Sequence, residues 1–395
     1  MAEGGYANAV RTAQLVASKG VRRGWRGVGK PWRSVARFFT KAPSRLLIAP
    51  QDIRTADPTV AADIYAGFFA LSGKVVNTHG QSPFEIPPPS PAWAAALAGF
   101  GWLRHLRAAD TALARANARA LVSDFIAHGA ANPALPVWQP RVTARRLLSW
   151  ISQSPMILEG ADAVFYTRFM KALSRHSGRL QSAMSDGIEG EDRLLAAIAL
   201  AQIGLCSEGA ENFARLRARQ LSTELIAQIL PDGGHIGRNP QLLIDLLLDL
   251  LPLRQAFVAR GAEPPQALLN SIDRMIPMLR TFRMGDGSMA LFNGMGVTSP
   301  HLIATILAYE DGRASGLMNA PKSGYQRIEA GRSVSPRGWR RSNVRRPSSA
   351  PCTILTRGTP SSAAGPSPSR STGTRGRVPR RHLPSSHAVR HRPAP

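Results

Sequence analysis

Cysteine is nearly absent from this chain of 395 residues, which contains only Cys206 and Cys352. Two cysteines so far apart provide neither a disulfide framework nor a set of metal ligands. Cys206 lies in an apolar helical run and is predicted to be a small core residue. We therefore expect no metal ion, and nothing in the sequence predicts a cofactor.

Long apolar runs are absent as well. The longest one near a helix centre, Leu194–Cys206, falls well short of the roughly 18 residues that span a bilayer. The N-terminus is basic but has no continuous apolar stretch, so no standard secretory signal is visible. No transmembrane segment is expected.

Acidic residues are scarce at both ends of the chain, which has a formal net charge of +25. Residues 1–50 contain ten Lys or Arg and one acid, whereas residues 333–395 contain thirteen Arg and no Lys, Asp or Glu. Residues 51–332 are nearly neutral, with 27 basic and 24 acidic side chains. Contact with nucleic acid or a membrane is therefore expected of the termini and not of the middle.

The two basic ends have different compositions. The composition of residues 1–45 predicts either an adaptor segment that lies on the folded body or a short basic helix that contacts a membrane surface or a polyanion. Residues 335–395 contain too few apolar side chains to offset the entropy of ordering, and disorder is predicted. An Arg/Pro/Ser mixture without lysine or acids is typical of GC-rich DNA translated out of frame, the interpretation we favour. A genuine Arg-rich arm that binds polyanions without specificity is the alternative.

Helical periodicity extends over residues 46–320, and about ten helices are predicted. Four helix starts combine a capping side chain with a proline at the first helical position. These are Asp57-Pro58, Ser90-Pro91, Asn239-Pro240 and Ser299-Pro300. Apolar residues then recur at three-and-four spacing, as in Ile64/Phe68/Leu71, Trp93/Leu97/Phe100 and Phe165/Phe169/Leu173. No fixed-period repeat supports a regular solenoid, and strand-like alternation is scarce before "GYQRIEAGRSV" at 324–334.

Two long stretches make the chain resemble a known family. "RLLIAPQDIRTADPTVAADIYAGFFALSGKVVNTHGQSPFEIPPPSPAWAAALAGFGWLRHLRAA" and "QILPDGGHIGRNPQLLIDLLLDLLPLRQAF" are similar to the bacterial heparinase II/III family of polysaccharide lyases, and the match covers roughly residues 45–332. In that family an incomplete α/α toroid of helical hairpins precedes an antiparallel β-sandwich, with the substrate between them. The resemblance implies a toroid over 46–320 and the first strand of a sandwich at 321–334.

The resemblance also implies a chemistry, β-elimination on a uronic-acid polysaccharide. Such an enzyme must neutralise the sugar carboxylate and supply Tyr or His as base and acid. The toroid helix that would carry an Asn-His pair here reads "GEDRLLAAIALA", with Asp192 and Arg193 at those places. The helix after "DGGHIGRNP" contains no tyrosine, so the catalytic set is depleted.

The turn "PDGGHIGRNP" supplies His235 as the candidate catalytic residue, with Arg238 and Asn239 as candidates for binding an anionic sugar. In the structural alternative, Asn239 caps the next helix and His235 satisfies loop carbonyls. Arg193 is a candidate to neutralise a uronate with Asp192 beside it, or the two form a surface ion pair.

Two aromatic segments add further candidates. Trp102 and His105 share one helical face and suit a sugar site, although core packing is the alternative for Trp102. Trp138 and Arg141 precede a helix that the resemblance places at the cleft. Asp245 and Asp249, spaced i and i+4, are predicted to form a polar stripe or to pair with a neighbouring arginine rather than to bind metal.

The sequence therefore predicts a mainly α protein, a toroid followed by a stub of sandwich and a basic tail. Its predicted function is a lyase acting on acidic, glycosaminoglycan-like polysaccharide, with a depleted catalytic set. The alternatives are a non-catalytic toroid that binds acidic glycan, or polyanion and nucleic-acid binding through the termini. The family implies the periplasm or cell envelope, whereas the lack of a visible signal keeps the cytoplasm open.

Overall fold

The computed structural model describes the backbone of residues 45–315 and the side chains of residues 45–299 and 301–310. The chain divides into two units, Met1–Arg332 and Ser333–Pro395, and every described residue belongs to the first. The predictions for the basic segment at 1–44, the sandwich strand at 321–334 and the tail at 335–395 lie outside the described residues.

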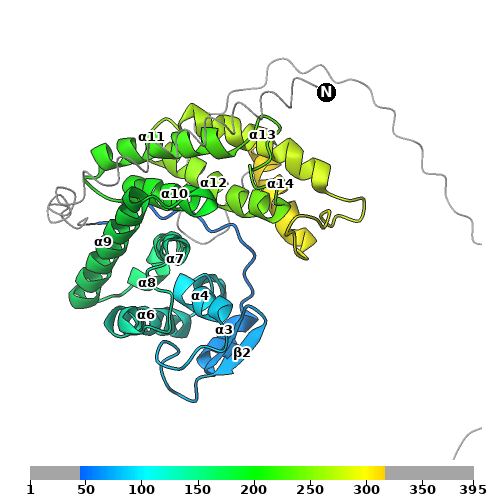
Figure 1. Ribbon diagram of the computed structural model, residues 1–395. Helices are drawn as coiled ribbons and strands as arrows, with labels where there is room; N and C mark the ends of the chain where they lie inside the picture. Colours follow the sequence, from blue (N-terminus) through cyan, green and yellow to red (C-terminus); the bar gives the residue numbers. More distant parts are fainter. Residues whose placement is uncertain (1–44, 316–395) are drawn as a thin grey trace, which may run out of the picture. The chain divides into compact units, whose positions relative to one another are not determined.

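Twelve α-helices, one 3₁₀ turn and one β-hairpin make up the described part of the chain (Figure 1). The elements are α3 (Thr59–Tyr65), β1 (Phe68–Leu71), β2 (Lys74–Asn77), α4 (Pro91–Gly99), α5 (Leu103–Ala109), α6 (Ala112–Ala127), η2 (Gly129–Ala131), α7 (Pro140–Ser152), α8 (Ser154–Leu158), α9 (Ala163–Asp186), α10 (Gly190–Cys206), α11 (Glu211–Gln228), α12 (Pro240–Ala259), α13 (Gln266–Phe282) and α14 (Pro300–Ser315). The prediction of a mainly helical protein is confirmed.

The C-terminal helices form two rows. Helix α10 packs on α11 and α12 on α13, and across the rows α10 packs on α12 and α11 on α13. The segment Leu194–Cys206 of α10 is buried throughout, which explains why it is apolar on every side. Cys206 is fully buried in the core as predicted.

The predicted capping residues lie at the helix starts. The Ser90 side chain accepts from the backbone N–H of Trp93, and that of Asn239 accepts from Gln241. Asp57 accepts from the backbone N–H and the hydroxyl of Thr59 at the start of α3. These bonds satisfy N–H groups that have no partner within the helix.

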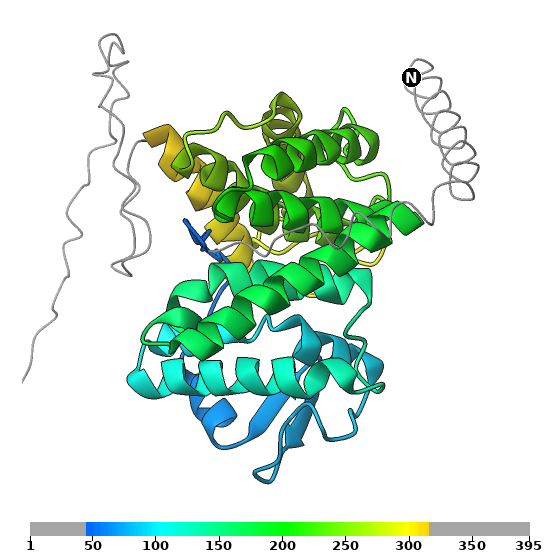
Figure 2. The same cartoon turned by 90° about the vertical axis from the view of Figure 1, so that its left-hand side faces the viewer.

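The β-hairpin corrects one part of the sequence interpretation. Phe68 and Leu71 were assigned to a helix with Ile64, but α3 ends at Tyr65 and both residues lie in β1. The two strands pair in antiparallel register across a two-residue turn, Ser72-Gly73, in which both residues have positive φ. A two-residue turn of this geometry matches the twist of the strands on either side of it. The segment therefore forms a hairpin, although its apolar residues have helical spacing. Figures 1 and 2 place the hairpin at the end of the body opposite α11 and α13.

The turn that follows α11 is repeated after α13, a local repeat that the sequence interpretation missed. In each turn the same backbone hydrogen bonds recur at an offset of 54 positions, and an aspartate Oδ1 accepts from the backbone two residues later. The equivalent pairs are Leu230/Met284, Asp232/Asp286, Gly233/Gly287, Gly234/Ser288 and His235/Met289. The polar turn is therefore one of two copies of a hairpin connection.

Candidate functional site

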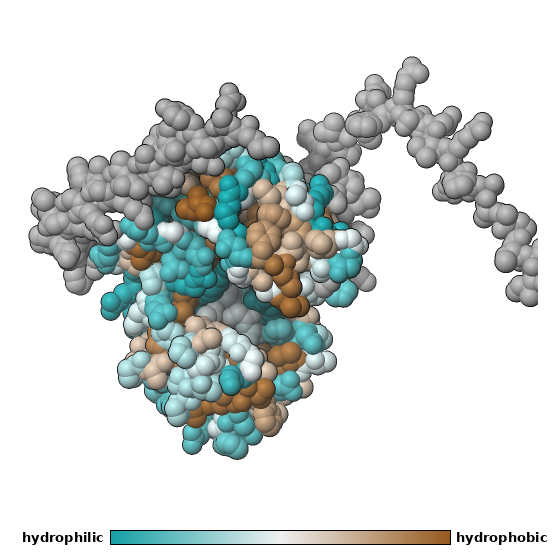
Figure 3. All heavy atoms as spheres, turned by 45° about the vertical axis from the view of Figure 1, so that its right-hand side comes forward, coloured by the Kyte–Doolittle hydropathy of each residue, from teal (hydrophilic) through white to brown (hydrophobic). Residues whose placement is uncertain are grey.

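A cleft of about 440 Å³ lies where the extended segment before α3 and helices α4, α5 and α7 meet α10 and α12. The space-filling view shows the described body hollowed between two parts, with hydrophilic residues at the edges (Figure 3). Its polar and charged lining consists of Gln51, Asp52, Arg54, Arg104, His105, Arg141, Arg145, Ser149, Ser152, Gln202, Asp245 and Asp249. This volume falls within the range of about 300–1,000 Å³ that is usual for small-molecule sites.

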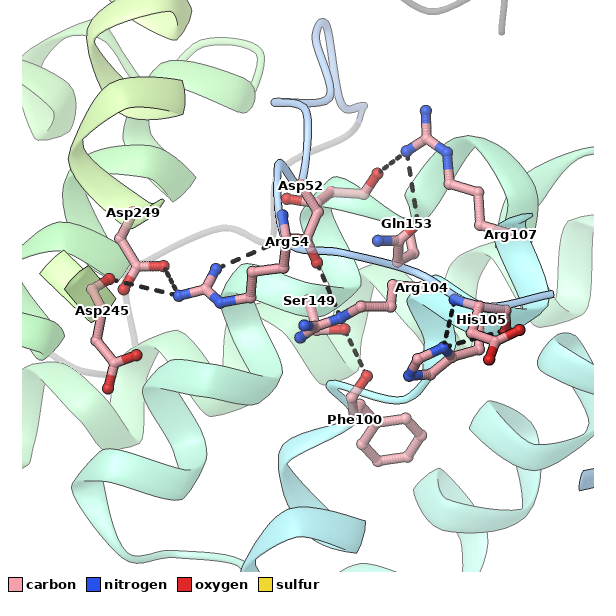
Figure 4. A network of polar contacts seen from close by, with 12 residues as sticks. Asp52, Arg54, Phe100, Arg104, His105, Arg107, Ser149, Gln153, Asp245 and Asp249 are labelled. Carbon is pink, nitrogen blue, oxygen red and sulfur yellow. Dashed lines mark hydrogen bonds and ion pairs between the residues drawn. The ribbon is translucent and has the colours of Figure 1, made fainter. Parts of the chain in front are cut away.

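Five of these side chains form a chain of alternating charge across the cleft. Figure 4 shows four of them, Arg104, Asp52, Arg54 and Asp249. Asp249 accepts from Arg54 at 2.7 Å and from Arg145 at 2.6 Å. Asp52 lies 3.7 Å from Arg54 and 3.4 Å from the Nε of Arg104. The order is therefore Arg104, Asp52, Arg54, Asp249 and Arg145. We name these five residues the Arg–Asp chain.

The Arg–Asp chain connects parts of the sequence that lie far apart. Asp249 lies on α12, an otherwise apolar helix, and its side chain is only 3% exposed. Asp245, one turn earlier, lines the cleft and offers its carbonyl to Arg54 at 3.5 Å. The predicted pairing of the aspartate stripe with an arginine is confirmed for Asp249. The segment Gln51–Arg54 was not predicted to belong to the site.

Burial and neighbouring charges shift the pKa values of the Arg–Asp chain in different directions. Burial opposes the ionisation of Asp52, but Arg104 and Arg54 outweigh it and hold the pKa of this carboxyl below its usual range. Burial also disfavours the charged form of Arg54, yet Asp249 and Asp52 raise its pKa above the ordinary value. For Arg104 the effect of burial is the largest, and it lowers the pKa. Repulsion from Arg54 and Arg145 lowers the pKa further, and attraction to Asp52 offsets only part of this decrease.

Arg104 is therefore the least compensated cation of the cleft. Its Nε faces Asp52 at 3.4 Å, a distance that counts as an ion pair, and that nitrogen has no hydrogen bond. No hydrogen bond or ion pair joins either of its Nη atoms to any residue of the described range 45–315. A guanidinium with open donors next to two further arginines can bind an anionic group in a bidentate manner.

Three of the predicted site residues line the cleft: Trp102, His105 and Arg141. Nδ1 of His105 lies 3.0 Å from the backbone nitrogen of Asp57 and 3.2 Å from its carbonyl oxygen, so the ring is held against this backbone in either tautomer. Burial and the neighbouring Arg104 lower the pKa of His105. The Trp102 ring is almost fully buried and donates to the Leu97 carbonyl, so its faces are not open to a sugar.

The residues at the start of α10 are engaged with protein groups. Arg141 forms ion pairs with Glu191 and Asp192. Arg193 lies outside the cleft lining, where it pairs with Glu224 at 2.6 Å and donates to the carbonyl of Met184. The roles predicted for Asp192 and Arg193 in substrate binding have no support in these contacts.

Trp138 also lies outside the cleft lining. Its ring stacks on His176 at 5.0 Å, and the guanidinium groups of Arg175 and Arg179 lie over it at 5.4 and 5.0 Å. The three partners all come from α9, so the ring is engaged by cation–π and stacking contacts within the protein. Trp138 therefore contributes to the packing of the segment before α7 against α9.

The turn that contains His235, Arg238 and Asn239 lies away from the cleft lining as well. His235 is 5% exposed, donates through Nε2 to the side chain of Gln228 and accepts through Nδ1 from Gly237. Burial lowers its pKa to about 4. Arg238 pairs with Asp232 inside the same turn. Asn239 is the helix cap described above.

The repeat explains why this turn has its composition. His235 occupies the position of Met289 in the second copy, and both side chains are buried. A Cβ on Gly233 would lie 2.0 Å from the carbonyl oxygen of Arg274 on α13, so no larger residue fits there. The "DGGH" motif therefore has a packing role that depends on contact with α13.

The lining of the cleft limits the chemistry that its side chains can perform. His105 is its one imidazole, and no tyrosine or cysteine belongs to the lining residues that the structure describes. Among residues 45–315 no group of three or more His, Cys, Asp or Glu could hold a metal ion. Within the same range no helix is sufficiently long and apolar to cross a membrane. The cleft thus offers recognition groups, mainly arginines and amides.

Two solved structures, of a heparan sulfate lyase and of heparinase III, have a similar arrangement of helices. Over 76% of this chain and 50% of theirs, the heparan sulfate lyase HepC from Pedobacter heparinus superposes with a TM-score of 0.51 at 17% identity. The fold is heparinase-like. A crystal structure of heparinase III superposes over 70% of this chain and 48% of that chain, with a TM-score of 0.50 at 14% identity. The predicted resemblance to heparinase II/III is confirmed at the level of the fold.

The sequence comparison finds a relative that is not named as a lyase. FtsZ-localized protein C from Caulobacter vibrioides is 30% identical over 312 residues, which are 79% of this chain and 53% of that protein. The chain thus spans about half the length of the relatives that it matches. No protein-family model matches the sequence.

Proposed function

We propose that the cleft of this heparinase-like domain binds an acidic saccharide and does not cleave it. The observation that carries the proposal is the open guanidinium of Arg104, whose Nη donors face a polar cleft without a protein partner. Arg54 and Arg145 each pair closely with Asp249, so among the three arginines Arg104 has the weakest counter-charge and the greatest gain from an incoming anion.

The absence of a matched acid and base in the described lining argues against elimination. That reaction needs one group to remove the proton beside the carboxylate and another to protonate the leaving oxygen. His105 is the one lining residue with a suitable side chain, and its Nδ1 is held by the backbone of Asp57. The two carboxylates of the Arg–Asp chain are each engaged by two arginines, which makes them poor bases.

The ligand class follows from the donors. An arginine fork fits the planar carboxylate of a uronic acid, and Ser149, Ser152 and Gln202 add neutral polar groups to the same cleft. The name of HepC refers to heparan sulfate, an acidic polysaccharide of this class. An acidic glycan is therefore the ligand that we propose for this chain.

The test is to mix the full-length protein with an oligosaccharide of glucuronic acid. Binding would be followed by titration calorimetry, and cleavage by ultraviolet absorbance of the double bond that elimination creates. We expect binding without any rise in absorbance, and no binding of a neutral oligosaccharide of the same length. A rise in absorbance would show that the chain is a lyase, and absence of binding would refute the proposal.

A second candidate function rests on the sequence relative. Because FtsZ-localized protein C is 30% identical over 79% of this chain, we propose that this protein also localises with FtsZ. A fluorescent fusion of the full chain, imaged together with labelled FtsZ, tests this directly. We expect coincident bands, and a signal spread over the whole cell would refute it. The Arg104→Gln variant should localise normally if position in the cell and saccharide binding are independent.

A further inference from the structure

One polar side chain of the cleft has no explanation in the fold itself. Gln202 lies on α10 within the apolar segment Leu194–Cys206, and it is 3% exposed. It also lines the cleft, together with Arg104 and Arg145. No hydrogen bond joins its amide to any side chain or backbone group of the described residues. Of the other two buried glutamines in the described range, Gln228 pairs with Glu224 and His235, whereas Nε2 of Gln153 has no partner there.

The amide of Gln202 has no protein partner among the described residues, yet its oxygen and nitrogen are not sealed from solvent, so they are open to a ligand in the cleft. Leucine or methionine would fill the same space in this helix at lower cost. The amide also differs from the arginines around it, since it offers a carbonyl acceptor as well as N–H donors. A group that both donates and accepts hydrogen bonds therefore satisfies this amide best.

A hydroxyl group has this property, whereas a simple anion such as sulfate only accepts. We propose that Gln202 binds a ring hydroxyl of the saccharide whose acidic group lies at Arg104. In this arrangement Arg104 recognises the charge and Gln202 recognises the sugar. The cleft would then select an acidic sugar with free hydroxyls over an inorganic anion. This inference rests on the proposed function and adds to it the residue that distinguishes a sugar from other anions.

The experiment compares wild type with Gln202→Met, which has similar length and no hydrogen-bonding group. Both full-length proteins are titrated with an oligosaccharide of glucuronic acid and, separately, with inorganic sulfate. We expect the variant to bind the oligosaccharide about 3- to 10-fold more weakly, the effect of losing one or two neutral hydrogen bonds. Its affinity for sulfate should equal that of the wild type, and its melting temperature should be unchanged or higher.

Salt provides a second readout that a merely structural role would not produce. The loss of affinity for the oligosaccharide in Gln202→Met should be the same factor at low and high salt, because the lost interaction is uncharged. The loss of affinity in Arg104→Gln should become smaller as the salt concentration rises. Gln202→Leu serves as a second apolar variant in case methionine disturbs the packing.

The contrary outcomes are separable. If wild type binds the oligosaccharide and both apolar variants bind it equally well, the role of Gln202 is refuted and the proposed function stands. Equal losses for sulfate and oligosaccharide would mean that the variant has altered the whole cleft, which also refutes the role. If the wild type binds no acidic oligosaccharide, the proposed function fails and this inference fails with it.

Discussion

The guanidinium of Arg54 donates to the carboxylate of Asp249 at 2.7 Å, although 195 positions separate the two residues in the sequence. Arg54 belongs to the extended segment before α3, and Asp249 to the middle of α12. The contact ties the N-terminal segment to the helix that forms the other wall of the cleft. It is also the central pair of the Arg–Asp chain, so the stability of the body and the charge of the cleft depend on the same atoms.

Replacing Asp249 by asparagine should strongly destabilise the protein. The change leaves Arg54 and Arg145 without their shared counter-ion, and breaking a buried pair by removing one partner costs about 3–5 kcal/mol. Chemical denaturation would measure the free energy of unfolding. The matched control is Asp232→Asn, which weakens an exposed pair with Arg238 and should cost at most about 1 kcal/mol. Equal losses of stability in the two variants would contradict the central role of Asp249 in the Arg–Asp chain.

Arg104 and Arg54 should respond in opposite ways to the same substitution. Arg104→Gln removes a cation that burial and two neighbouring arginines disfavour, so stability should change by less than about 1 kcal/mol or increase. Arg54→Gln removes the cation between Asp52 and Asp249 and should cost about 3 kcal/mol or more. Thermal melts of the two variants provide the comparison, and a larger loss for Arg104→Gln would be contrary to this prediction.

His235 should make the fold sensitive to acid. Its pKa is about 4 in the folded protein, below the ordinary value of 6.5, so between these limits the unfolded chain binds more protons. Stability is therefore fully present above about pH 6.5 and declines as the pH falls towards 4. The contribution of this one group is on the order of 1–3 kcal/mol.

The His235→Met variant tests that assignment, since methionine occupies the equivalent position 289. It should lower stability at neutral pH by about 1–2 kcal/mol, because Gln228 and Gly237 lose their partner. The slope of stability against pH between 4 and 6.5 should become shallower than in the wild type. An unchanged slope would mean that other groups, such as the buried His176, account for the acid sensitivity.

Gly233→Ala should prevent stable folding or cost more than about 3 kcal/mol, because the new Cβ would meet the carbonyl of Arg274 at 2.0 Å. Gly261→Ala is the matched control. Gly261 also has a positive φ, of 65°, but no atom lies within 4 Å of its Cβ position. The control should cost only about 1 kcal/mol, the strain of the left-handed conformation. Similar losses in both would show that close packing on α13 is unimportant.

Much of the fold could be predicted because its signals are local. Caps before proline and apolar spacing identified the helices, and the buried segment Leu194–Cys206 was recognised by its uniform apolarity. The hairpin at 68–77 was missed because its strands are short and Phe68 and Leu71 happen to continue a helical spacing. The deciding feature was the turn, Ser72-Gly73, whose two positive φ angles are not visible in a pattern of apolar residues.

The site was harder to predict because its residues meet only in the folded chain. Arg141, Trp102 and His105 were predicted and line the cleft, whereas Asp52, Arg54 and Gln202 were not singled out. Gln202 did have a signal, since it is the one amide in an apolar helical segment. His235 attracted attention through a motif that, in this structure, is required for packing between helices. The comparison of the two turns, at 228–236 and 282–290, was the clue that could have revealed this.

The measurement that tests the central claim most directly is a titration of three full-length proteins with an oligosaccharide of glucuronic acid. The proteins are wild type, Arg104→Gln and Arg238→Gln, and both variants lose one arginine while keeping the basic termini. We predict that wild type and Arg238→Gln bind equally, and that Arg104→Gln binds at least about 10-fold more weakly, the loss of one charge-assisted contact. Equal binding by all three proteins would contradict the account, because it would place the binding site outside the cleft.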